Sequence, residues 1–156
     1  MFLLQMVAFL LFQSSNDIQG ALKTAARQTG AGFDYLLRTA MQESSLRPDA
    51  KAPTSSATGL FQFIESTWLR TLKSEGHRFG LSQYASEIDN TSGRFTVHNP
   101  ETRQEILDLL NDPRISALMA DALAGPTASV FRSALTRAPT DGILFLQLLL
   151  GSNGSE

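Results

Sequence analysis

Glu43 is the residue whose type and position point most directly to chemistry. It follows the apolar residues Leu36 and Ala40 by seven and three positions, so it lies along the apolar stripe of a helix expected over 33–45. An apolar surround and the carbonyl-lined end of a helix both disfavour a carboxylate, so we predict a raised pKa for Glu43. A glutamic acid that stays protonated towards neutral pH is suited to general acid–base catalysis. The alternative is a solvated glutamate at a frayed helix end.

A second segment with chemical promise is Ser56–Phe63, which reads SATGLFQF. Gln62 offers two amide donors and a carbonyl acceptor to polar groups of a ligand. Phe61 and Phe63 point to opposite sides if the segment is extended, so one ring is a candidate for stacking on a ligand. The alternative is that both rings belong to the core, as is more usual for aromatic residues close to Trp68.

Serine and glycine residues surround these two segments. Ser44, Ser45, Ser55 and Ser56 are candidates for orienting Glu43 or binding a ligand, although serines near a proline also simply satisfy turns. Gly59 is expected to permit close packing or an unusual backbone dihedral angle. We do not interpret any of these serines as a nucleophile, because neither histidine stands near a Ser-Asp arrangement.

Glu43–Pro48 and Ser56–Phe63 together resemble the signature of lytic transglycosylases of the soluble lytic transglycosylase (SLT) type, which belong to the lysozyme-like superfamily and cleave peptidoglycan. In that family a Glu-Ser pair, a nearby Pro and a Gly-Leu-aromatic-or-Met-Gln element recur in this order at similar spacing. The likeness extends over roughly residues 17–151. Three further segments are similar to exported SLT-domain proteins of some Gram-negative bacteria: Thr58–Trp68 (TGLFQFIESTW), Asp112–Ala120 (DPRISALMA) and Pro139–Gly142 (PTDG).

The resemblance implies a lysozyme-like single domain with a glycan-binding groove near Gln62. It implies cleavage of the MurNAc-GlcNAc β-1,4 bond, with Glu43 as acid and then base and no cofactor. The N-acetyl group of the N-acetylmuramic acid assists departure, and its own 6-hydroxyl closes a 1,6-anhydro ring. Phe61, Ser44, Ser45, Ser56 and Phe145 are the further residues expected to contact or position the glycan.

Such substrate-assisted chemistry needs no second carboxylate. This agrees with the sequence, because the nearest acidic residues have other expected roles. We interpret Asp34 as a residue of the first helical turn, Asp49 as a loop residue and Glu65 as part of the cap before Thr67 and Trp68.

Two departures from the family pattern keep other functions open. Phe145 occupies the place where many relatives carry a tyrosine facing the catalytic glutamate, so one hydrogen bond is missing. The chain also ends soon after Gly151, where related proteins usually continue. The alternatives are a muramidase that hydrolyses with water, a catalytically inactive peptidoglycan-binding or assembly module on the same fold, and an unrelated helical interaction domain.

The composition excludes several classes of function. Thirteen Lys and Arg against fifteen Asp and Glu leave a net charge of −2, which does not favour nucleic acid as a partner. Without cysteine, and with only His77 and His98, neither a zinc site nor another metal site is expected. We expect a monomer whose partner is the glycan strand, and the sequence identifies no protein partner in an envelope machine.

Hydrophobic spacing predicts a mainly α fold. Asp17 is expected to cap a helix that Gly30 ends, and a short extended piece is expected at Arg94–Val97. Asn99 with Pro100 and Asp112 with Pro113 each predict a helix start. Further helices are expected over 66–75, 127–136 and 143–150, the last apolar almost all round.

The N-terminal residues 1–15 form a possible signal peptide or an N-terminal apolar helix, and 16–156 the catalytic domain. Met1–Phe12 is apolar except for Gln5, a length typical of a secretory signal and too short to span a membrane. Cleavage is expected near Ser14 or Ser15, although no basic residue precedes the apolar run. We therefore expect export to the periplasm or cell envelope, with a buried N-terminal helix as the alternative.

Overall fold

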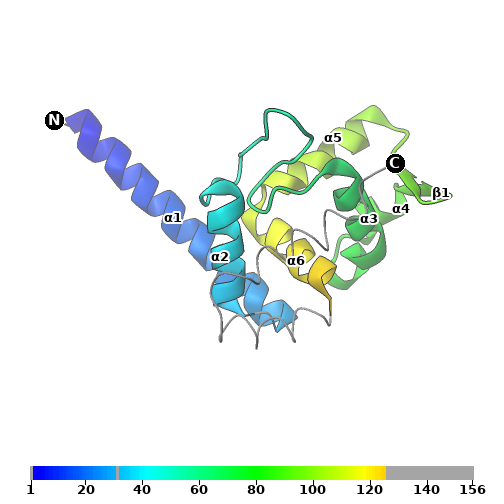
Figure 1. Cartoon of the computed structure of the whole chain (residues 1–156), viewed down its shortest axis with the longest axis horizontal. Helices are drawn as coiled ribbons and strands as arrows, with labels where there is room; N and C mark the ends of the chain where they lie inside the picture. Colours follow the sequence, from blue (N-terminus) through cyan, green and yellow to red (C-terminus); the bar gives the residue numbers. More distant parts are fainter. Residues whose placement is uncertain (1, 31, 126–156) are drawn as a thin grey trace. The chain divides into compact units, whose positions relative to one another are not determined.

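The computed structural model describes residues 2–30 and 32–125, and over these residues the chain is mainly helical, as predicted (Figure 1). The chain divides into two compact units, residues 1–123 and 124–156. The expected helices over 127–136 and 143–150, and with them Phe145, lie outside the described residues. The elements are α1 (Phe2–Thr29), α2 (Phe33–Ser44), α3 (Glu65–Glu75), the 3-10 helix η1 (Gly76–Phe79), α4 (Ser82–Ser86), β1 (Asp89–Thr91), β2 (Arg94–Thr96), α5 (Pro100–Asp108), the 3-10 helix η2 (Leu109–Asn111) and α6 (Pro113–Ala124).

Helix α1 begins much earlier than the sequence predicted. Asp17 lies in the middle of one continuous helix and does not cap a new one. No proline or glycine interrupts residues 2–19, so nothing in this stretch breaks the helix at the polar residues 13–17. Gly30 does end the helix, with a φ of 76° and its backbone N–H donating to the carbonyl of Ala26 at 2.9 Å.

The two Asx-Pro helix starts are confirmed. The Asn99 side-chain oxygen accepts from the backbone N–H of Thr102 at 2.8 Å, and Pro100 opens α5. The Asp112 side chain accepts from the backbone N–H of Ile115 at 2.9 Å, one turn into α6. Each side chain satisfies a donor that the first helical turn would otherwise leave unpaired.

The extended piece expected at Arg94–Val97 is one strand of a hairpin. Strand β2 pairs with β1 in antiparallel register, with Asn90 opposite Phe95. Ser92 and Gly93 connect the strands with φ angles of 53° and 87°. Two consecutive positive φ angles are typical of the tight turns that match the twist of a two-stranded ribbon.

One hydrophobic core joins residues from the helices of the first unit. Helix α2 contributes Leu36 and Ala40 from the stripe that also carries Glu43, and α3 contributes Trp68, which is fully buried. The Trp68 indole N–H donates to the carbonyl of Ile106 at 2.9 Å, so α3 is tied to α5 within the core. Other fully buried members of the core are Leu22, Leu60, Leu72, Ile88 and Met119.

The described side chains in the N-terminal part of α1 add nothing to this core, so the alternative of a buried N-terminal helix is wrong for residues 2–11. The large apolar side chains among residues 2–11 are all exposed, and Ile18 is the first that is buried. In Figure 1 this part of the helix extends away from α2, whereas the later part lies beside it. Within residues 2–30 and 32–125, no helix has both the length and the apolar content that crossing a membrane requires.

Candidate active site

Glu43 lies one residue before the end of α2 and is half-buried. Burial removes water from the carboxyl group and raises the pKa of Glu43 above its ordinary value of 4.5, in the predicted direction. The carboxyl group is therefore protonated over a higher pH range than a solvated glutamate. This is the protonation behaviour that a general acid needs.

The backbone turns sharply immediately after Glu43 and Ser44. Ser45 and Leu46 adopt the left-handed conformation, with φ angles of 53° and 61°, at a cost of about 1–2 kcal/mol each. Their backbone N–H groups donate to the carbonyls of Met41 and Ala40 at 2.9 and 3.2 Å. Two carbonyls at the end of α2 thus gain partners. The exposed side chain of Ser45 takes no part in these bonds.

Ser44 connects the two segments that the sequence analysis singled out. Its buried hydroxyl lies 2.8 Å from the carbonyl of Leu60 and 3.0 Å from the carbonyl of Ala40, and it accepts from the backbone N–H of Arg47 at 3.2 Å. Because Leu60 lies between Gly59 and Gln62 in the second segment, this contact brings that segment to the end of α2. The Ser44 hydroxyl therefore connects the end of α2, next to Glu43, to the second segment, and it is buried and already engaged in these contacts.

The second segment forms a closed turn, Thr58–Phe63, hereafter the Gln62 turn. Thr58 and Phe63 exchange two backbone hydrogen bonds of 3.0 and 3.1 Å across its base. Gly59 has a φ of 83°, and a Cβ at this position would collide with the backbone carbonyl of Leu110. Both properties expected of Gly59, close packing and an unusual dihedral, are thus present.

Gln62 adopts a strained conformation that its own side chain helps to hold. Its φ is 49°, in the left-handed region, and its side-chain nitrogen donates to the carbonyls of Ala50 and Gly59 at 3.1 and 2.9 Å. The nitrogen must face these two carbonyls, because the reverse orientation would set oxygen against oxygen. Among the described residues the side-chain carbonyl of Gln62 has no partner. Gln62 thus has a free acceptor, and both donors that the sequence suggested for a ligand are already used.

Phe61 and Phe63 are buried, as the core alternative predicted, and Phe61 is only 8% exposed. The Phe63 ring packs edge-on against Trp68 with 5.2 Å between the ring centroids. In this conformation Phe61 leaves little surface on which a sugar ring can stack.

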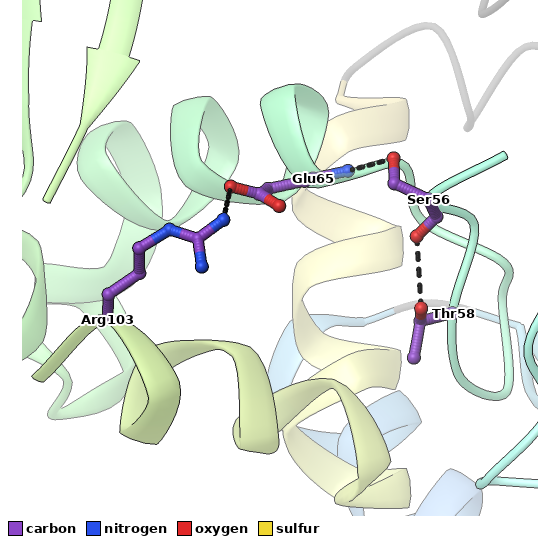
Figure 2. Close-up of polar contacts among 4 residues, drawn as sticks. All are labelled: Ser56, Thr58, Glu65 and Arg103. Carbon is purple, nitrogen blue, oxygen red and sulfur yellow. Dashed lines mark hydrogen bonds and ion pairs between the residues drawn. The ribbon is translucent and has the colours of Figure 1, made fainter. Parts of the chain in front are cut away.

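Ser56 and Glu65 meet at the start of α3 (Figure 2). The Ser56 hydroxyl accepts from the backbone N–H of Glu65 at 3.1 Å, and the Ser56 carbonyl accepts from the hydroxyl of Thr58 at 3.0 Å. Ser56 therefore caps α3 from nine residues upstream, a role that the sequence analysis assigned to Glu65. Instead, the Glu65 carboxylate pairs with Arg103 of α5. The Ser55 hydroxyl accepts from the backbone N–H of Ala57 at 3.2 Å, as a turn serine does.

Within residues 2–30 and 32–125, Asp34 and Asp49 take the places expected of them from the sequence. Asp34 occupies the first turn of α2, as expected, so about 14 Å of helix separates it from Glu43. Asp49 lies exposed in the loop that follows α2, also as expected. In the described part of the chain, no group of three His, Asp or Glu side chains is arranged to hold a metal ion.

Sequence reasoning missed Arg103, which lies 38 residues from its partner Glu65. No local pattern signals such a contact, because it depends on how α3 and α5 pack.

A comparison of the chain with models of known protein families finds no family that matches.

Proposed function

We propose that the protein is a peptidoglycan lytic transglycosylase of lysozyme-like fold, with Glu43 as its general acid and base. The proposed groove lies between the end of α2 and the Gln62 turn, and it accepts a glycan strand without a cofactor. The proposal places the enzyme in the periplasm or elsewhere in the cell envelope, since peptidoglycan is found there.

The hydrogen bond from Ser44 to the Leu60 carbonyl is the observation that carries this proposal. It joins the Glu-Ser pair to the Gly-Leu-Phe-Gln element, two segments that are sixteen residues apart at this contact. A chance likeness in sequence gives no reason for the two segments to meet. Their meeting, with a half-buried glutamate beside the contact, supports a common site.

The proposed reaction uses one carboxyl group twice. The protonated Glu43 donates its proton to the glycosidic oxygen, and the bond from C1 of MurNAc to that oxygen breaks. The acetamido oxygen of the same sugar bonds to C1 and holds the positive charge. The Glu43 carboxylate then takes the proton of the 6-hydroxyl, whose oxygen attacks C1 and releases the acetamido group. The product carries a 1,6-anhydro ring, and Glu43 is protonated again.

Gln62 suits a supporting role in this reaction. Its free side-chain carbonyl accepts hydrogen bonds, so it recognises a donor on the substrate such as an acetamido N–H or a sugar hydroxyl. The bonds from its nitrogen to Ala50 and Gly59 hold that carbonyl in place before the substrate arrives. A pre-positioned acceptor loses little freedom on binding.

Digestion of purified peptidoglycan tests the proposal. Peptidoglycan is incubated separately with the wild type, with Glu43→Gln and with the control Glu87→Gln, and the soluble products are identified by mass spectrometry. Glu87 serves as the control because it is an exposed glutamate after α4. We expect anhydro-muropeptides from the wild type and the control, and a loss of about 10²-fold or more for Glu43→Gln.

Other outcomes would replace the proposal by one of its alternatives. Products with free reducing ends indicate a hydrolytic muramidase. Binding of glycan by a folded wild type that releases no product indicates a binding or assembly module. If the folded wild type neither binds nor cleaves the glycan, the result favours an unrelated helical interaction domain.

A further inference from the structure

Ser56 contacts residues at both ends of the Gln62 turn, and one of these residues is paired with α5 (Figure 2). At the first residue of the turn, the Thr58 hydroxyl donates to the carbonyl of Ser56 at 3.0 Å. After it, the backbone N–H of Glu65 donates to the hydroxyl of Ser56 at 3.1 Å. Ser56 thus links the two ends, and the Glu65 side chain extends from the same point to Arg103.

The Arg103–Glu65 pair joins α5 to the first residue of α3. The helix dipole already favours a carboxylate at this position, so charge neutralisation alone does not require an arginine there. What Arg103 adds is a fixed direction for the Glu65 side chain, since the donors of a guanidinium group are rigid and charge-assisted. The two side chains are 42% and 34% exposed, so solvent weakens the pair without removing it.

The backbone of Gln62 gives a reason why the turn needs such support. A non-glycine residue with a φ of 49° is strained, and it keeps that conformation only where its surroundings impose it. Gln62 lies three residues before Glu65. A shift of Glu65 and Ser56 would therefore release one end of the turn and move the free carbonyl of Gln62.

We propose that Arg103 is a positioning residue for glycan binding, which acts through Glu65 and Ser56 on the Gln62 turn. This inference rests on the proposed function of that turn as a sugar-binding element. Arg103 touches no substrate, and the reaction at Glu43 does not use it.

The test compares Arg103→Met, Arg103→Lys and the control Arg70→Met in the full chain. Methionine keeps much of the apolar stem and removes the charge, whereas lysine restores a cation. Arg70 is an exposed arginine of α3 with no ion pair among the described residues. The measurements are kcat and KM on soluble uncrosslinked glycan strands, the affinity for chitotetraose, the pH profile and Tm.

We expect Arg103→Met to raise KM and weaken chitotetraose binding about threefold to tenfold. The kcat and the position of the pH profile stay within about twofold and a few tenths of a pH unit, because Glu43 is held separately by Ser44. Arg103→Lys recovers most of the affinity, and Arg70→Met leaves it unchanged. Unchanged KM and affinity in Arg103→Met would overturn the proposal. An equal loss of affinity in all three variants, accompanied by an equal fall in Tm, would also overturn it.

Hydrogen exchange separates this inference from the proposed function. The backbone N–H of Gln62 donates to Gly59 at 3.2 Å inside the turn and reports on its opening. We expect faster exchange of this N–H in Arg103→Met than in Arg70→Met, whether or not a sugar binds. If the wild type binds no glycan while exchange still accelerates, the proposed function fails and the positioning of the turn stands. Equal exchange in the two variants refutes the positioning role.

Discussion

At the scale of the residue, the property that suits Glu43 to catalysis also lowers the stability of the fold. Burial holds the folded-state pKa above 4.5, so the folded protein binds more protons than the unfolded chain as the pH rises through this region. Stability therefore falls with rising pH between the unfolded and folded pKa values, and the loss remains above them. A neutral side chain of the same shape does not carry this penalty.

Glu43→Gln should accordingly be more stable than the wild type at about pH 7 and similar to it at about pH 3, where both side chains are neutral. Urea unfolding at the two pH values measures the difference. Glu87→Gln is the matched control for the same substitution at an exposed glutamate. A variant that is less stable than the wild type at pH 7 would contradict the desolvation argument.

At the scale of the element, the Ser44 hydroxyl connects the end of α2 to the Gln62 turn. The hydroxyls of Ser44 and Ser74 both lie 3.0 Å from the carbonyl four residues earlier in their helix. Only Ser44 is buried and also reaches Leu60. A comparison of Ser44 with Ser74 therefore separates the contribution of the contact with Leu60 to the free energy of unfolding from that of the local contact within the helix.

Ser44→Ala should lower the free energy of unfolding by about 1–3 kcal/mol, because it leaves the buried carbonyl of Leu60 without its hydroxyl partner. Ser74→Ala should change it by less than about 0.5 kcal/mol. Chemical denaturation measures both. We also expect Ser44→Ala to reduce activity while the folded fraction stays high, and activity equal to that of the wild type would show that the contact does not position Glu43.

The turn that carries Gln62 also depends on the absence of a side chain at Gly59. Gly59→Ala combines a φ of 83° with a collision against the Leu110 carbonyl, and should cost about 2–4 kcal/mol. Gly30→Ala is the matched control: its φ is 76°, but its Cβ meets nothing within 4 Å, so about 1 kcal/mol is expected. Similar losses in the two variants, measured by denaturation, would argue against the close approach.

At the scale of the whole molecule, α1 has two parts with different roles. From Ile18 onward it contributes buried side chains to the core, whereas the large apolar residues 2–11 are exposed. Exposed apolar surface gives no packing energy to the folded state. The fold of the described residues therefore does not depend on the N-terminal part.

A chain that begins at Asn16 should keep its Tm within about 2 °C of the full chain. A chain that begins at Lys23 loses Ile18 and Leu22 from the core and should be destabilised by several kcal/mol. Thermal unfolding distinguishes these cases. Intact mass of the exported protein tests the leader itself, with cleavage near Ser14 or Ser15 expected and an uncut N-terminus contradicting it.

Local patterns were enough to predict several features. Hydrophobic spacing predicted the mainly α fold, Asn99 and Asp112 predicted two helix starts, and the stripe of α2 predicted a Glu43 with a raised pKa. The helices and their starts depend on residues a few positions apart, so the chain encodes them locally. The apolar stripe predicted the direction of the Glu43 pKa shift, although the burial that causes the shift needs the packed fold. The same logic failed at Asp17, because a possible cap does not stop a helix whose preceding residues are also helical.

The tertiary structure alone decided which polar groups meet. The Ser44–Leu60 contact spans 16 residues and the Glu65–Arg103 pair spans 38, so both depend on how helices and turns pack. In the packed structure both donors of Gln62 are bonded and the Phe61 ring is buried, so only the acceptor remains of the two donors, acceptor and stacking face that the sequence suggested. Sequence by itself thus determined the candidate residues and their helices. Their roles were decided by three-dimensional contacts, because a hydrogen bond depends on distances between atoms and not on separation along the chain.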